Sequence, residues 1–168
     1  WLIVDCGVTF GDPTYGSVEV SMPDIVAIED SKESICGLLL THAHEDHIGA
    51  VHHLWPYLRC PVYATAFAAE VLIKKLIEAG LEKEVDINII NIDSEIKIGP
   101  FDIEIISMSH SIIEPSAALI STSAGSVFHT GDWKIDYNPQ IGEGINKKRL
   151  QSLGKENLLA MVCDSTNI

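Results

Sequence analysis

A short segment rich in histidine constrains this chain more than any other feature. The apolar residues 38–40 are followed at once by the string Thr-His-Ala-His-Glu-Asp-His at 41–47. Residues 38–40 predict a buried strand whose period of two would direct His42 and His44 to the same side, and Asp46 and His47 open a pattern of helical spacing. Two pairs of donors would therefore face one point. Imidazole and carboxylate groups are zinc ligands, so the segment predicts a metal site.

Length and composition indicate an ordinary globular protein. The chain has 168 residues, of which 46% are hydrophobic and 21% are charged, enough for one domain with a core. No apolar run approaches the roughly 20 residues that span a bilayer, and no basic region precedes the first apolar run as in a signal peptide. We therefore expect no membrane partner. The chain lacks an initiator Met and opens within an apolar run, so we expect it to be a fragment of a longer protein.

The formal net charge is −13, which argues against a surface that binds a nucleic-acid duplex. A polyanionic substrate would have to be held by bound metal or by a basic domain elsewhere. Two small basic clusters, 74–75 and 147–149, are expected to be solvated helix faces.

The four cysteines contain no Cys-x-x-Cys pair and lie within or beside apolar runs. This usage is typical of buried free thiols in a reducing cytosol, so we expect a cytoplasmic protein. The residues are Cys6, Cys36, Cys60 and Cys163.

Apolar periodicity and turn residues predict an alternation of strands and helices. A helix is expected from Asp46 to Leu58, and a second should follow Thr65 and end at Ala79, with Gly80 as a left-handed cap. A short helix is expected from Lys147, and a loop around Gly11, Pro13 and Gly16. Strands are expected at 1–4, 34–40, 62–64, 87–92, 95–98, 101–107, 117–122, 126–129 and 158–163.

Three further candidates follow apolar runs, at the ends of predicted strands. Asp5 follows the first strand, His110 follows residues 101–107, and Asp132 follows residues 126–130 through Gly131. Taken alone, Asp5 could cap a loop, His110 could be an ordinary loop histidine, and Asp132 could be a turn residue. The four clustered donors at 42–47 cannot complete two metal shells, which favours a ligand role for His110 and Asp132. Asp5 would then orient a ligand. His52, His53 and His129 are expected to be packing or surface residues.

These residues together resemble the metallo-β-lactamase superfamily, whose four motifs correspond here to Asp5, residues 42–47, His110 and Asp132. More narrowly, four strings resemble the ribonuclease J branch of the β-CASP nucleases. They are Thr-His-Ala-His-Glu-Asp-His-Ile-Gly-Ala at 41–50, Ser-His-Ser-Ile at 109–112, Thr-Gly-Asp-Trp-Lys-Ile-Asp at 130–136 and Cys-Asp-Ser-Thr-Asn at 163–167.

The resemblance implies an α/β fold, the metallo-β-lactamase-type αββα sandwich, which we expected to contain two mostly antiparallel sheets. Residues 1–168 would be the N-terminal part of the catalytic domain, without the β-CASP insert and the C-terminal part. It also implies one zinc on His42, His44 and His110, and a second on Asp46, His47 and a downstream histidine, with Asp132 bridging. Asp46 and Asp164 would be catalytic, Asp164 by orienting a downstream histidine that protonates the leaving oxygen.

The activity that the resemblance implies is zinc-dependent hydrolysis of RNA, by exonuclease or endonuclease cleavage, in a longer protein compatible with a homo-oligomer. The 168-residue chain by itself is expected to be inactive and to hold one zinc or none. Two alternatives remain open at this point. One is a small-molecule hydrolase of the thioesterase or lactonase type, and the other is a metal-free structural or regulatory module.

Overall fold

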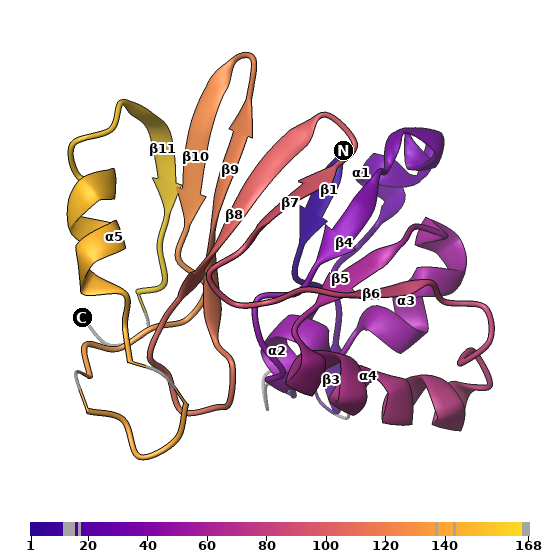
Figure 1. The fold of residues 1–168 in the computed structure, drawn as a ribbon. Helices are drawn as coiled ribbons and strands as arrows, with labels where there is room; N and C mark the ends of the chain where they lie inside the picture. The colour runs from indigo at the N-terminus through magenta and orange to yellow at the C-terminus, as the bar shows by residue number, and fades with distance from the viewer. Residues whose placement is uncertain (12–15, 17, 137, 143, 166–168) are drawn as a thin grey trace. The chain divides into compact units, whose positions relative to one another are not determined.

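The computed structural model describes residues 1–11, 16, 18–136, 138–142 and 144–165. The chain divides into two compact units, Trp1–Ile89 and Ile90–Ile168. Each unit carries its own sheet (Figure 1). Mixed helices and strands confirm the α/β class predicted from the sequence.

The first unit is built on a four-stranded sheet of order β1-β4-β5-β6. Its strands are β1 (Leu2–Val4), β4 (Gly37–Leu39), β5 (Val62–Ala64) and β6 (Ile87–Ile89). All three pairings are parallel, so the prediction of mostly antiparallel sheets is wrong here. Parallel neighbours need crossover connections, and helices between successive strands provide them. The carboxyl ends of β1 and β4, which precede Asp5 and His42, therefore lie at the same edge.

The predicted helix from Asp46 to Leu58 is in fact two helices, α2 (Glu45–Ile48) and α3 (Val51–Leu58), separated at Gly49 and Ala50. The later helix α4 (Ala66–Ala79) has the predicted bounds. Gly80 follows it with φ 71°, the left-handed conformation that glycine adopts at little cost. Thr65 is the N-cap residue, but its side chain makes no capping hydrogen bond.

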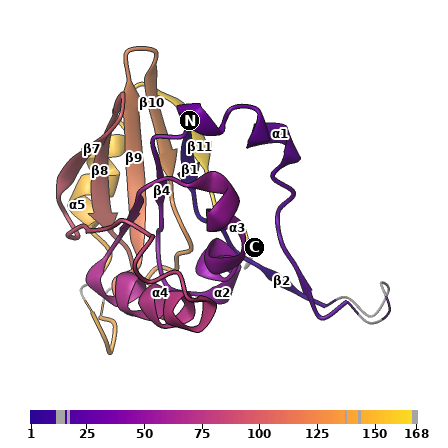
Figure 2. The same cartoon turned by 90° about the vertical axis from the view of Figure 1, so that its right-hand side faces the viewer.

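Between β1 and β4 the chain forms a small antiparallel pair, β2 (Thr9–Phe10) and β3 (Val20–Ser21), where only a loop was predicted. Figure 2 shows β2 leading away from the parallel sheet of its own unit. Pro13 of the predicted loop lies outside the described residues. A one-turn helix α1 (Val26–Glu29) and a 3₁₀ turn (Lys32–Ser34) complete the connection.

The second unit is a five-stranded sheet of order β11-β10-β9-β8-β7. The strands β7 (Glu95–Ile98), β8 (Phe101–Ser107), β9 (Ser116–Thr122) and β10 (Gly125–His129) pair antiparallel. The last strand, β11 (Leu158–Val162), runs parallel to β10. Strands β8, β10 and β11 therefore run in one direction and end at one edge, where His110, Asp132 and Asp164 follow them.

Helix α5 (Lys147–Leu153) packs against one face of this sheet (Figure 1). Its Leu153 is buried and its Leu150 partly buried against the core side chains Ile106, Met108, Ala117, Leu119 and Phe128. Arg149 reaches Glu104 on β8 through two hydrogen bonds of 2.6 Å, so this member of the basic cluster is not a solvated face. Strand β11 was predicted to be buried, but four of its five residues are exposed because it is an edge of this sheet.

Among the described residues, no helix combines the length and the hydrophobicity needed to cross a membrane. All four cysteines are free thiols, as predicted. Cys6 and Cys60 are buried, Cys36 is half-buried, and Cys163, which we predicted to be buried, is exposed.

The free thiols should differ sharply in their rates of alkylation. Burial raises the pKa of Cys6 and of Cys60 from 9.0 to about 11, and the thiolate is the reactive form, so each should react about 100-fold more slowly than an ordinary thiol. Iodoacetamide labelling near pH 8, followed by peptide mass spectrometry, should modify Cys163 first. Denaturant should make the four rates similar. Rapid labelling of Cys6 in the native protein would contradict its burial.

The two buried thiols also affect stability. Because both folded-state pKa values are raised, these thiols favour the folded state below pH 9, and this contribution is lost as the pH rises toward 11.

Candidate metal centre

His42 is delivered by the most buried strand of the first unit. Leu38, Leu39 and Leu40 are at most 1% exposed, and the Leu40 N–H donates to Tyr63 O at 2.9 Å, which extends the ladder beyond β4. The chain leaves the sheet immediately afterwards, so His42 is held at the sheet edge and is itself only 1% exposed. A buried imidazole at a strand end has little freedom to move, which suits a metal ligand.

Asp5 follows β1 at the same edge and accepts three hydrogen bonds from two residues. Its Oδ1 accepts from the Thr41 N–H, and its Oδ2 accepts from the Thr41 hydroxyl, both at 2.8 Å. Asp5 Oδ2 also lies 2.7 Å from His47 Nδ1. The carboxylate can only accept, so His47 Nδ1 carries a proton, and in the neutral ring Nε2 then presents a lone pair. This is the contact that an orienting acid requires.

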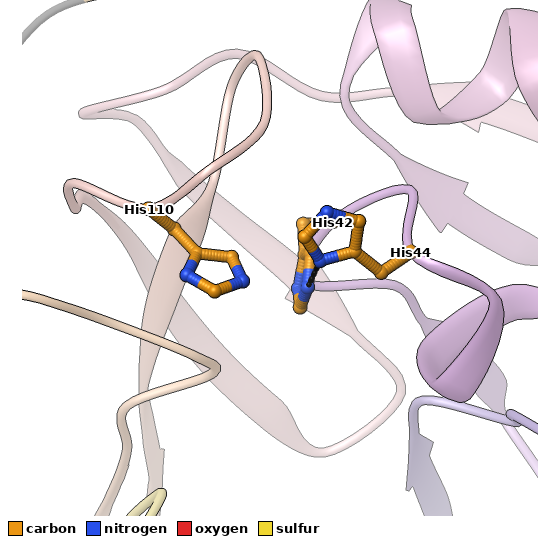
Figure 3. Close-up of side chains that lie close together, drawn as sticks. All are labelled: His42, His44 and His110. Carbon is orange, nitrogen blue, oxygen red and sulfur yellow. Dashed lines mark hydrogen bonds between the residues drawn. The ribbon is translucent and has the colours of Figure 1, made fainter. Parts of the chain in front are cut away.

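His42 and His44 approach each other through their ring nitrogens. His42 Nε2 lies 3.0 Å from His44 Nδ1, and the rings meet edge to face (Figure 3). His42 Nδ1 lies 3.0 Å from the hydroxyl of Thr41, which gives its own proton to Asp5. A neutral His42 that donates from Nδ1 then has a lone pair on Nε2. Two convergent imidazole nitrogens are what a zinc ion would take, so these residues fit a metal.

The turn that carries Asp46 and His47 is held by the loop after β1. Cys6 N–H donates to His47 O at 2.7 Å, Val8 N–H donates to Glu45 O at 3.0 Å, and Ala50 N–H donates to Cys6 O at 3.0 Å. Gly7 lies between these contacts, and a Cβ placed on it would lie 1.6 Å from Asp46 O. Only glycine allows this backbone approach.

Two acidic side chains of the turn have different environments. The Asp46 side chain is 64% exposed, and its Oδ2 lies 3.7 Å from His47 Nε2. It is therefore accessible to solvent and close to a candidate ligand nitrogen. Glu45, in contrast, is paired with Lys75 of α4 at 2.6 Å. Glu45 and Lys75 thus join α2 to α4, and Lys75 is not the solvated side chain that we predicted.

In the second unit, His110 and Asp132 lie close together. His110 Nε2 is 3.6 Å from Asp132 Oδ2, and both residues are half-buried. Their loops are joined by a hydrogen bond from the Lys134 N–H to Ser109 O at 2.8 Å. The same edge of the sheet thus presents an imidazole and a carboxylate together.

Asp164 lies at the end of β11, next to the loop that carries Asp132. Its N–H donates to Thr130 Oγ1 at 3.2 Å, and the Thr130 N–H donates to Val162 O at 3.0 Å. His129 accepts from the Gly131 N–H at 3.1 Å, so it supports the turn before Asp132. Thr166 and Asn167, quoted above for the resemblance, lie outside the described residues.

His52 and His53 lie in α3, and their ring centroids are 3.9 Å apart. Burial, and next the neighbouring His53, lower the pKa of His52 from its ordinary value. His52 Nδ1 is buried without a hydrogen-bond partner. His52 is half-buried and His53 is exposed, as expected for packing or surface residues.

Two residues of the site were missed by the sequence reasoning, Thr41 and Gly7. Thr41 immediately precedes His42, but its contact with Asp5 depends on the parallel pairing of β1 and β4, which was not predicted. Gly7 follows Asp5 and Cys6 at the end of the first predicted strand, and nothing in these residues predicted the close approach to Asp46.

The chain is similar to a family of known proteins over most of its length. A family model described as a Beta-lactamase superfamily domain matches residues 1–150. Ribonuclease J of Sinorhizobium meliloti is 44% identical over 167 residues, which cover 99% of this chain and 30% of that protein. Ribonuclease J of Helicobacter pylori strain 26695 is 36% identical, with coverages of 99% and 24%. Ribonuclease J 1 of Streptococcus pyogenes is 34% identical, with coverages of 99% and 30%. The chain thus spans less than a third of each relative.

Solved structures agree on the fold. The metallo-β-lactamase fold protein YhfI of Bacillus subtilis matches with a TM-score of 0.56 and 21% identity, covering 78% of this chain and 49% of that one. Zinc-bound PqqB of Methylobacterium extorquens matches with a TM-score of 0.54 and 13% identity, covering 77% of this chain and 44% of that one. At these identities the likeness concerns the fold alone, and it confirms the predicted metallo-β-lactamase type.

Gly7→Ala should damage the turn that carries Asp46 and His47. The added methyl would overlap Asp46 O, so either the loop or the turn must move, at a cost of about 2 kcal/mol or more. Urea unfolding of the chain should show this loss, and the chain should bind zinc more weakly. Gly154→Ala is the control, because a Cβ there would lie 3.7 Å from Gln151 O, an ordinary van der Waals contact. Equal stability of the two variants would contradict the close approach.

Proposed function

We propose, from the premise that this chain belongs to the β-lactamase superfamily, that it is the metal-binding part of a zinc-dependent ribonuclease. The observation that carries the proposal is the pair of ring nitrogens on His42 and His44, 3.0 Å apart. The relatives named Ribonuclease J, at 34–44% identity over almost the whole chain, support RNA as the substrate. Because those proteins are more than three times longer, the remaining parts of such an enzyme would lie in a longer polypeptide.

The ligands proposed for the first zinc are His42, His44 and His110, each of which offers one imidazole nitrogen. Asp46 and His47 would hold a second zinc, with Asp132 shared between the two ions. These three residues leave the second ion short of one protein donor, which a longer chain would supply. We therefore expect the 168-residue chain to hold its second zinc poorly, because the loss of even an outer-shell partner weakens metal binding about 10 to 100-fold.

Bound zinc would supply Lewis acidity, which lowers the pKa of a water molecule and neutralises charge on the phosphodiester. The chain's own side chains would do the rest. Asp46 is exposed and beside His47 Nε2, where its carboxylate can accept a hydrogen bond from the attacking water and orient it. Asp164 would orient a downstream histidine that protonates the leaving oxygen.

The grip on RNA must come largely from outside these residues. The net charge of −13 repels a polyanion within about 8 Å, the Debye length at physiological salt. Basic regions of a longer chain, or of a second copy in a homo-oligomer, would supply the missing attraction. The free thiols are consistent with a reducing compartment, and we place the protein in the cytoplasm.

The two alternatives left open above are less well supported. The relatives reported above are all named ribonucleases, which does not favour a thioesterase or lactonase. A metal-free module is not favoured either, because the relatives share a name that denotes an enzyme and the family model covers residues 1–150.

His44→Ala should abolish RNA cleavage by the protein that carries this chain, because it removes a donor from the metal that activates water. The matched control is His53→Ala, which removes an imidazole from α3 and should leave the rate within about threefold, as surface changes usually do. Rates on a labelled RNA and the zinc content of both variants are the measurements. Similar losses of cleavage and zinc in the two variants would show that the site is misplaced.

A further inference from the structure

We propose that Thr41 is a positioning residue that fixes the tautomer of His42. Through it, Asp5 would set the tautomers of two ligands at once, His47 directly and His42 by relay. The proposal deepens the proposed function and rests on it for the identity of the metal. Its geometric basis lies wholly within the first unit.

The relay follows from counting protons. Thr41 has one hydroxyl proton, and Asp5 Oδ2 at 2.8 Å is a carboxylate oxygen that can only accept it. Thr41 Oγ1 can therefore only accept from His42 Nδ1, which lies 3.0 Å away. His42 then carries its proton on Nδ1, and Nε2, the nitrogen directed at His44, presents a lone pair. Without this relay the proton could sit on Nε2 and block the ligand position.

The second branch starts from the same carboxylate oxygen. His47 Nδ1 lies 2.7 Å from Asp5 Oδ2, so His47 also carries its proton on Nδ1. The two rings belong to different proposed zinc positions, and their centroids are 4.0 Å apart. One acid would thus prepare a nitrogen for each ion, and only the His42 branch passes through Thr41.

Burial makes the hydroxyl difficult to replace. Thr41 and His42 are each 1% exposed, so water has little access to take over a lost hydrogen bond. The Thr41 N–H donates separately to Asp5 Oδ1, and Thr41→Val keeps that contact and the shape of the side chain. The substitution therefore removes the relay while leaving the backbone anchor.

The test compares Thr41→Val with the conservative Thr41→Ser in the 168-residue chain. Long-range ¹H–¹⁵N correlation spectra at about pH 8, where imidazole is neutral, report the protonated nitrogen of each histidine. His42 and His47 should both be protonated on Nδ1 in the wild type, with or without zinc. In Thr41→Val, His42 should lose this preference while His47 keeps it. Zinc affinity, measured by competition with a chelating dye, should fall about 10 to 100-fold in Thr41→Val and stay within about threefold in Thr41→Ser.

Several results would overturn the proposal. A wild-type His42 protonated on Nε2 would do so, even if Thr41→Val failed to fold. Unchanged tautomer and zinc affinity in Thr41→Val would do so as well, as would a loss of the Nδ1 proton on His47 equal to that on His42. A wild type with the expected tautomers that binds no zinc would instead count against the proposed function, while the relay itself would be supported.

Discussion

The carboxylate of Asp5 is the constraint on which the arrangement of candidate ligands in the first unit depends. Asp5 has φ 61°, a left-handed conformation that costs a non-glycine residue of order 1 kcal/mol or more. The Asp5 N–H still donates to Leu39 O, so the residue turns out of β1 without losing its place at the sheet edge. Three donors on the carboxylate oxygens offset the strain. The conformation of one residue thus joins the end of β1, the end of β4 and the turn that carries Asp46 and His47.

The turn that carries Asp46 and His47 would not be stable by itself. Helix α2 has four residues. A helix of one turn is unstable by itself, because ordering its backbone costs more free energy than its few hydrogen bonds contribute. Its backbone is fixed by Cys6 and Val8 on one side, and its Glu45 is paired with Lys75 on the other. The positions of Asp46 and His47 are therefore consequences of tertiary contacts from segments far away in the sequence. This explains why a single methyl group on Gly7 should matter to a metal site.

Local spacing allowed candidate donors to be named, because ligand chemistry restricts residue type strongly, and their binding of metal stays a prediction. The bounds of β7 and β8 were also predicted, since Gly99 and Pro100 mark the turn between them. Properties that depend on partners far along the chain could not be predicted from local spacing. The parallel direction of β4, the break at Gly49 and the exposure of β11 all depend on what each element packs against. Thr41 belongs to the same class, since its role appears only when β1 lies beside β4.

The hydrogen bonds at the end of β1 require an acid at position 5 rather than its amide. Asparagine has the same shape, but one of its two terminal groups is an NH₂ that donates. At the position of Oδ2, this NH₂ would face both the Thr41 hydroxyl and His47 Nδ1. Both partners would then have to accept, so the His47 proton would move to Nε2 and Thr41 could no longer be relied on to accept from His42. The reversed amide would instead place NH₂ against the Thr41 N–H, a donor facing a donor. Only a carboxylate satisfies all three donors and leaves Nε2 of His42 and of His47 unprotonated, as the proposed zinc sites require.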